Sequence, residues 1–328
     1  MKKITFILAV LATILIQTNL SAQTVFVLQN GNRTLFYSSM SDVTTNLQNG
    51  DTLYLPPKPI DGSFTFDKQV AIIGAGYHTD TALVTGITKI TGHVYFAKGS
   101  KGSSMTGVRT EGNVYVRDSS ITTTRCSVAS IEVQNGSNPI SQVYFGDCVI
   151  RGNIEGCNDI VTNILVERCV IKGNVGSGNK TNNLMVKNCV FTTTGSWLFS
   201  YLQNLIVQNC IIVNNASYFL YNSSSITFTN NLFVHAEFSS SSFSMTGNVF
   251  GVTQTDIFVD EANGDYHIKP TLTQALTLAT DGKEVGVFGT NYPFLVPTYA
   301  PRFISINNAE NVVDGKLSVK MKVEARDR

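Results

Sequence analysis

The sequence predicts an all-β protein, a right-handed parallel β-helix of about ten coils. The first observation is a short pattern that repeats six times between residues 142 and 250. The copies share one anchor position, occupied by Cys148, Cys169, Cys189, Cys210, Asn231 and Asn248. The steps between these anchors are 21, 20, 21, 21 and 17 residues, and an earlier copy is centred on Cys126. A period near 21 fits one turn of a solenoid and is too short for a helical hairpin repeat.

The second observation is the spacing of apolar residues within each copy. Ile164 alternates with Val166, and Leu205 with Val207, which is the period of a strand with one buried face. After Val207 the next inward residue is Cys210, three positions on, so an extra residue must turn the chain there.

The third observation is the residue just before the anchor. In five copies it is of a type that tolerates a left-handed backbone: Asp147, Asn188, Asn209, Asn230 and Gly247. Arg125 and Arg168 depart from this pattern. Strands joined by a tight bend, with every coil in the same register, describe a parallel β-helix.

The two ends of the repeat predict closing structures. Apolar residues at Tyr37, Met40, Val43 and Leu47 have helical spacing, with Ser39 or Ser41 as a cap, and such a helix would cover the open end of the first coil. Beyond residue 250 the repeat dissolves. We expect the β-helix with its cap to span residues 23–295, and residues 296–328 to form a C-terminal β-hairpin tail around Asp314-Gly315.

The NCxF and NNxF pattern resembles secreted bacterial right-handed β-helix-repeat proteins of the pectate-lyase-like superfamily. The resemblance covers residues 51–289 and includes the helix followed by the GDTLYLP segment at residues 50–56. It implies the fold but no particular activity, since proteins with one fold perform many functions.

Composition and the N-terminus bound the partners. Charged residues make up 14% of the 328 residues and the net charge is +1, so nucleic acid is not an expected partner. Lys2 and Lys3, an apolar run over residues 4–16, and Leu20-Ser21-Ala22 predict a signal peptide at residues 1–22. The run is too short for a transmembrane span. We therefore expect a secreted or cell-envelope protein.

Six cysteines in an exported chain would ordinarily suggest disulfides. Five of them share one register, and parallel side chains on neighbouring coils keep the β-carbons farther apart than a disulfide prefers. They are therefore expected to form a buried stack of free thiols, continued by Asn231 and Asn248 as an amide ladder. A column cannot surround an ion, so neither a zinc site nor another cofactor is expected.

Catalytic candidates are few. Glycoside hydrolysis needs two carboxylates about 5–9.5 Å apart, hence acids in one register on adjacent coils. Measured from the anchor, Asp147, Glu155, Asp159 and Glu167 occupy different registers. One charged group remains: Arg125, Asp147 and Arg168 share the position before the anchor on three consecutive coils, with Glu167 beside them. A lyase would use such an arginine as a base, whereas the simpler interpretation is a ladder of surface ion pairs.

Aromatic residues supply the binding candidates. Trp197 and Tyr218 share a register on adjacent coils, and Phe199 and Tyr201 alternate on the strand of Trp197. Outward-facing rings would form a platform for sugar faces, whereas inward-facing rings would only be core.

An apolar strip is predicted on the outer surface. The residue after the anchor points outward yet is apolar in every copy, as at Val190 and Ile211, and so is the mid-strand position at Leu165 and Met185. Such a strip usually marks a surface that something covers. The expected cover is the apolar tail at residues 297–323.

The sequence leaves three functions open. The leading hypothesis is an exported, non-catalytic protein that binds glycans or other surface partners. The alternatives are a polysaccharide lyase or hydrolase with an atypical site, and a structural spacer of the cell envelope.

Overall fold

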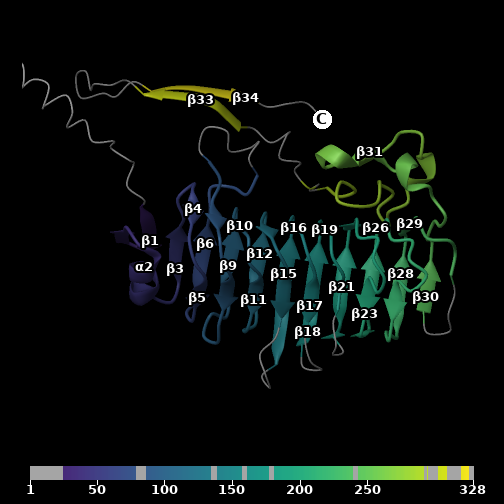
Figure 1. Ribbon diagram of the computed structural model, residues 1–328, viewed down its shortest axis with the longest axis horizontal. Helices are drawn as coiled ribbons and strands as arrows, with labels where there is room; N and C mark the ends of the chain where they lie inside the picture. The colour runs from purple at the N-terminus through teal and green to yellow at the C-terminus, as the bar shows by residue number, and fades with distance from the viewer. Residues whose placement is uncertain are drawn as a thin grey trace, which may run out of the picture.

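The chain forms a parallel β-solenoid of about eight turns with a period of about 21 residues. This computed structural model describes residues 25–78, 86–133, 139–156, 161–176, 181–238, 243–291, 294, 302–308 and 319–324. Figure 1 shows the strands stacked side by side along the rod, from β1 at one end to β30 at the other. The predicted signal peptide, Cys157 and Asp159 lie outside the described residues.

Three parallel sheets form the faces of the rod, named sheets A, B and C here. Sheet A contains, in spatial order, β2 (Arg33–Tyr37), β1 (Phe26–Asn30), β3 (Asp51–Tyr54), β6 (Val70–Ile73), β9 (Ser104–Thr106), β12 (Thr122–Thr124), β15 (Ile140–Gly146), β18 (Val161–Glu167), β21 (Leu184–Lys187), β25 (Ile206–Gln208), β28 (Ile226–Thr229) and β30 (Phe243–Thr246). Its strands are parallel from β3 onward, while β1 pairs antiparallel with β2 and β3.

Sheet B contains short strands, each just after the bend of its coil. They are β4 (Pro59–Ile60), β7 (Lys89–Ile90), β10 (Arg109–Thr110), β13 (Ser127–Val128), β16 (Val149–Ile150), β19 (Val170–Ile171), β22 (Val190–Phe191), β26 (Ile211–Ile212) and β29 (Leu232–Phe233). Sheet C contains β5 (Phe64–Phe66), β8 (Val94–Phe96), β11 (Val114–Val116), β14 (Ile131–Val133) and β17 (Ile154–Gly156).

Smaller elements complete the chain. Four strand pairs are β20 (Thr181–Asn182) with β24 (Leu202–Gln203), β23 (Phe199–Ser200) with β27 (Leu220–Tyr221), β31 (Phe258–Asp260) with β32 (Asp265–Ile268), and β33 (Arg302–Asn308) with β34 (Val319–Glu324). The helices are α2 (Met40–Asn46) and the 3₁₀ turns η2 (Gln254–Asp256), η3 (Glu261–Asn263) and η4 (Thr273–Ala275). The antiparallel pairing of β33 with β34 agrees with the predicted hairpin, whereas the domain boundaries stay predictions.

The solenoid has fewer turns than the ten that a constant period of 21 implied. Ala71 on β6 pairs with Ser104 on β9, so that coil takes 33 residues. The last parallel strand of sheet A is β30, which ends at Thr246. The coils on either side of that long coil are shorter, with 19 residues from Asp51 to Val70 and 18 from Ser104 to Thr122, so one long coil does not lower the count. The count is lower because the parallel ladder stops at β30. The right-handed sense stays a prediction, based on the preference of parallel crossovers for that hand.

The bend before each anchor is left-handed, as predicted. The φ angle is 55° at Asp147, 52° at Asn188 and 56° at Asn209. Arg125 and Arg168 keep the same conformation, each with φ of 50°, because the ladder on both sides fixes the path of their coils. A second left-handed column, which the sequence reasoning missed, runs along sheet A, just before β12, β21, β25 and β28 and within β15 and β18: Ser120, Gln142, Asn163, Asn183, Asn204 and Ser225.

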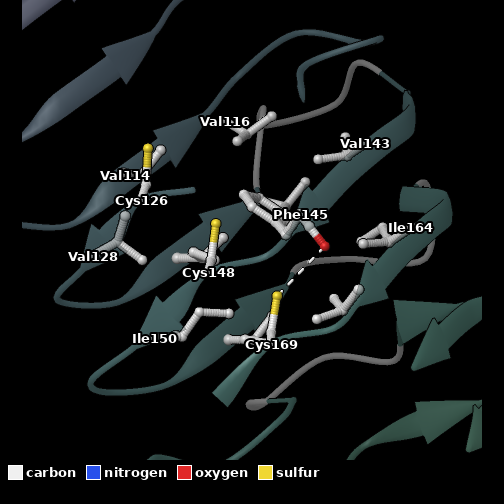
Figure 2. Packing of buried hydrophobic residues seen from close by; sticks show 14 of the residues in the cluster. Val114, Val116, Cys126, Val128, Val143, Phe145, Cys148, Ile150, Ile164 and Cys169 are labelled. Atoms are coloured by element: carbon white, nitrogen blue, oxygen red, sulfur yellow. Dashed lines mark hydrogen bonds between the residues drawn. The ribbon is translucent and has the colours of Figure 1, made fainter. Parts of the chain in front are cut away.

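The anchor column lies in the core. Cys126, Cys148, Cys169, Cys189 and Cys210 are fully buried and free, and Figure 2 shows the first three in a row beside Val128 and Ile150. Asn231 extends the column: its Oδ1 accepts from the backbone N–H of Cys210 at 2.8 Å. Its Nδ2 donates to the Val207 carbonyl at 2.9 Å, so the buried amide is satisfied.

The helix α2 starts where the sequence predicted. The Ser39 Oγ accepts from the Asp42 N–H at 3.2 Å, which caps the first turn. Met40 and Val43 are buried in the solenoid core, and α2 lies at the N-terminal end of the stack (Figure 1).

The outer apolar strip proves to be two separate faces, because the bend puts the mid-strand residues on sheet A and the residues after the anchor on sheet B. The expected cover was wrong. A second hydrophobic cluster joins Val190 and Ile211 of sheet B to Phe258, Val287 and other residues of the segment 252–294. By contrast, the side chains of Val319, Met321 and Val323 on the tail strand β34 are 44, 61 and 56% exposed. The cover is the segment that follows the last coil directly, and no tail is needed.

Hydrogen bonds attach the segment 252–294 to the left-handed residues that precede the anchors. The Asn209 amide both donates to Thr280 Oγ1 at 3.0 Å and accepts from the Thr280 N–H at 3.0 Å. The Asn230 Nδ2 donates to the Leu278 carbonyl at 2.6 Å. Sheet B is thereby closed to ligands along this stretch, whereas the described residues of this cluster leave the outer faces of sheets A and C uncovered.

Candidate functional site

The charged column at the bend of sheet A is an ion-pair network. Arg168 makes two parallel hydrogen bonds to Asp147, from Nε to Oδ1 at 2.8 Å and from Nη2 to Oδ2 at 3.0 Å. Its Nη1 lies 2.8 Å from Glu167 Oε2, and its Nη2 donates to the Tyr144 hydroxyl at 3.2 Å. Arg125 shares the column through its backbone, but its side chain is exposed and forms no ion pair with any described residue.

These contacts argue against a catalytic base at this position. The hydrogen bond to Asp147 raises the pKa of Arg168 above its usual range, despite partial burial. A guanidinium so paired is held in its charged form and cannot accept a proton from a substrate. Burial raises the pKa of Tyr144 to about 12, so this hydroxyl too stays protonated at neutral pH. Asp147, Glu167 and Arg168 are therefore best explained as an ion-pair network that stabilises the bend, in which Arg125 takes part only through its backbone.

An aromatic cluster lies on the outer surface of two consecutive coils. The side chain of Trp197 is 51% exposed, that of Tyr218 71% and that of Tyr221 42%. Trp197 and Tyr221 are stacked with centroids 4.9 Å apart, and Tyr201 meets Tyr221 edge-on at 5.4 Å. The backbone N–H of Trp197 donates to the backbone carbonyl of Tyr218 at 2.7 Å. The two residues therefore lie on neighbouring coils, as their spacing predicted.

Two of these aromatic residues have a strained backbone. The φ angle is 63° at Trp197 and 56° at Tyr201. Bulky residues rarely adopt the left-handed region, and each such residue costs about 1–3 kcal/mol, a strain often found at binding sites. In this backbone conformation both rings lie next to Tyr221.

The prediction that Phe199 belongs to this cluster is wrong. Phe199 is fully buried and contacts the rings of Phe191 and Phe228 in the core. Leu198, Phe199 and Ser200 are all buried, and the left-handed residues Trp197 and Tyr201 stand on either side of this run. Tyr221 takes the place of Phe199 in the cluster. The sequence reasoning missed it because the register of this loop-like half of the coil depends on the pairing of β23 with β27.

A groove runs along the outer face of sheet A. One of its lining residues, Asn204, follows Tyr201 by three positions in the sequence. The volume of the groove is about 1060 Å³. The side chains along it come from consecutive coils: Asn163, Ile164, Leu165, Asn183, Leu184, Met185, Asn204, Ile206, Ser224, Ser225, Ile226, Thr227, Phe243 and Ser244. None of these fourteen described residues is charged.

A pair of carboxylates lies on the outer face of sheet C. Glu132 on β14 and Glu155 on β17 are directly opposite each other in the parallel ladder. Glu132 accepts from Arg117 Nη2 at 3.1 Å, and Glu155 accepts from Asn153 Nδ2 at 3.1 Å. The expectation that no two acids share a register was therefore wrong. The coil of Glu155 has one more residue between anchor and strand than the coil of Glu132, so counting from the anchor separated them.

On the strands next to this pair, the same outward-facing position of sheet C carries stacked aromatic rings. Tyr95 and Tyr115 lie parallel, with centroids 4.6 Å apart and an angle of 4° between the rings. The Arg117 guanidinium lies over Tyr115, 5.0 Å from the ring centroid. One outward-facing row thus crosses four adjacent strands of sheet C and holds, in order, Tyr95, Tyr115, Glu132 and Glu155.

Two further features are absent from the part of the chain that the structure describes. No three His, Cys, Asp or Glu side chains there come together as metal ligands would. Within the same residues, no helix has the length and apolar character needed to cross a membrane.

Neither a comparison with protein-family models nor one with curated proteins finds a match for this chain. The outer faces of sheets A and C therefore carry the geometry from which a function can be inferred.

Proposed function

We propose that this protein is an exported, non-catalytic β-solenoid that binds glycans. The observation that carries the proposal is the exposed cluster of Trp197, Tyr201 and Tyr221 on two consecutive coils, with Tyr218 beside it. Aromatic faces are apolar, and their hydroxyl and indole groups form hydrogen bonds, so they suit ligands that present both C–H faces and hydroxyls. Sugar rings are such ligands.

Other observations support the class of protein. The basic, apolar and small-residue segments of residues 1–22 support export, to the outside or to the cell envelope. The NCxF repeat together with the parallel solenoid supports a place in the pectate-lyase-like superfamily. The ion-pairing of Arg168 removes the leading candidate for lyase chemistry.

The test is binding of the purified mature chain to immobilised neutral and acidic polysaccharides, with release of soluble sugar measured in the same samples. Trp197→Ala should weaken binding to the preferred glycan at least tenfold, the equivalent of about 1.4 kcal/mol. Phe36→Ala is the matched control, because the Phe36 ring is 69% exposed but lies on β2 at the other end of the rod. Equal effects of the two substitutions, or no glycan bound at all, would contradict the proposal.

A second candidate is a glycoside hydrolase with Glu132 and Glu155 as its carboxylates. Neighbouring strands lie about 4.8 Å apart, and carboxyl groups about 5–5.5 Å apart suit a retaining mechanism with one acid and one nucleophile. Release of reducing sugar by the wild-type protein, abolished by both Glu132→Gln and Glu155→Gln, would establish it. Binding without product release favours the non-catalytic function.

A further inference from the structure

We infer that the groove on sheet A takes a neutral, extended glycan whose chain runs along the solenoid axis with one sugar ring at each coil. This inference rests on the proposed glycan-binding function and names the ligand class and its direction. It starts from the regularity of the groove, which repeats the same two kinds of side chain on successive coils.

The first kind is a column of polar side chains at one edge of the groove. Asn163, Asn183, Asn204 and Ser225 stand at the same position of four consecutive coils, each exposed and each with φ of 55 or 56°. An amide both donates and accepts hydrogen bonds, as a sugar hydroxyl does. The column therefore offers matching groups at every coil.

The second kind is an apolar row beside that column. Leu165, Met185 and Ile206 are directly opposite one another on β18, β21 and β25. Leu165 and Met185 are half-buried and Ile206 is 39% exposed. Such a row contacts the C–H face of a sugar ring while the amides reach its hydroxyls.

The spacing sets the direction and length of the ligand. Successive coils are about 4.8 Å apart, close to the rise of one ring in an extended, β-linked polysaccharide. A chain along the axis meets one amide and one apolar side chain on each of three coils, and Ser225 with Thr227 on a fourth. The four coils of the column accommodate about four rings. A chain lying across the sheet would meet only one or two of them.

The charge of the groove selects a neutral ligand. All of its described lining residues are uncharged. Beside the groove, Glu167 on β18 stands opposite Lys187 on β21, one outward position beyond Leu165 and Met185, and Arg168 pairs with Asp147. The charges of both signs there do not favour an anion, and the lining residues themselves offer a uronate polymer no cation, whereas a neutral chain requires none.

The aromatic cluster is close to the groove in the sequence, which supports a glycan ligand for the groove. Tyr201 precedes Asn204 by three residues, and Tyr221 precedes Ser224 by three. The aromatic cluster therefore adjoins the edge of the groove that carries the amides, and a glycan held on the rings can continue into the groove.

The experiment measures binding of cello- and manno-oligosaccharides of two to six sugars by calorimetry, at low and high salt. Affinity should rise with length up to about four sugars, then level off, and should change less than twofold with salt. Asn183→Gly and Asn204→Gly should each weaken binding of the longer sugars at least fivefold. Glycine removes the amide but accepts the left-handed backbone, so folding is preserved. Gln142→Gly is the control, since Gln142 stands in the same column but does not line the groove.

The outcomes separate the two proposals. If Trp197→Ala abolishes glycan binding while Asn183→Gly and Asn204→Gly match the Gln142→Gly control, the glycan-binding function stands and the groove assignment fails. Binding restricted to acidic polymers, and lost at high salt, would overturn the neutral ligand. Self-association that Ile206→Asp abolishes, without sugar binding, would show that a second copy occupies the groove and would overturn both.

Discussion

At the scale of single residues, the anchor position carries most of the specificity of the fold. Each thiol fits between its neighbours one coil above and below, and the backbone N–H of Cys169 contacts the Cys189 sulfur at 3.4 Å. The Cys169 thiol in turn points to the Phe145 carbonyl at 3.6 Å, as Figure 2 shows. Small, weakly polar side chains can be repeated along such a column without leaving a gap or a charge.

The column predicts the behaviour of the thiols. Cys148, Cys169, Cys189 and Cys210 should remain reduced and should not react with a thiol reagent in the folded protein, because all four are fully buried. Denaturation without reductant should expose all of them. The measurement is a thiol titration before and after adding denaturant. Fewer than four new thiols, with a matching gain after reduction, would show disulfides in the native protein.

The alternation along β21 makes a second residue-level prediction. Val186→Asp should unfold the protein, because Val186 is fully buried and an unpaired buried charge costs several kcal/mol. Lys187→Ala, at the next position on the same strand, should change stability by no more than about 0.5 kcal/mol. Urea unfolding compares the two. Similar losses from both would show that the strand phase is wrong.

At the scale of elements, the same outward apolar residue has different roles on two adjacent strands. Ile206 on β25 faces the open groove, whereas Ile211 on β26 lies under the segment 252–294 and is fully buried. Both point away from the solenoid core. What distinguishes them is the cover.

This difference predicts unequal effects of one substitution. Ile211→Asp should detach the segment 252–294 and increase binding of a hydrophobic dye, because it places a charge inside the second hydrophobic cluster. Ile206→Asp is the control and should leave dye binding unchanged. Removing residues 296–328 should also leave it unchanged, since every described residue of the cover lies within 252–294. Dye binding that rises on this truncation would assign the cover to the tail after all.

At the scale of the whole molecule, repetition multiplies the effect of one buried group. Burial raises the pKa of Cys126, Cys148, Cys169 and Cys189 well above the usual thiol range. In the unfolded chain these thiols ionise near pH ~8.5. Above that pH the native state binds more protons than the unfolded state, so the free energy of unfolding must fall as the pH rises.

The stacked thiols therefore predict a steep alkaline loss of stability. Their contribution is fully present below the unfolded pKa and decreases above it by up to about 1.4 kcal/mol per thiol for each pH unit. Urea unfolding at neutral pH and at several alkaline values measures the slope. Cys169→Ala should reduce the slope by the share of one thiol. A profile that stays flat to pH ~10 would contradict the burial of thiols whose unfolded pKa is near 8.5.

Much of this molecule follows from the sequence alone. A repeat of fixed length places like residues on top of one another, so the 21-residue period determined the parallel solenoid, the anchor column and the bend before it. The helix with a serine cap, at Ser39 or Ser41, and the charged column of Asp147 and Arg168 also followed from local reasoning. These features depend on positions counted within one coil or between adjacent coils.

The rest was decided by tertiary structure, because coil length varies where the chain is not paired. A single extra residue between anchor and strand hid the register of Glu132 with Glu155. Phe199 is buried between the left-handed residues Trp197 and Tyr201, and Tyr221 on the next coil is exposed. The cover of sheet B depends on how an irregular segment folds back over many coils, and apolar content alone could not choose between residues 252–294 and the tail. Periodicity determines what stacks, whereas the unpaired turns determine which side chains reach the surface together.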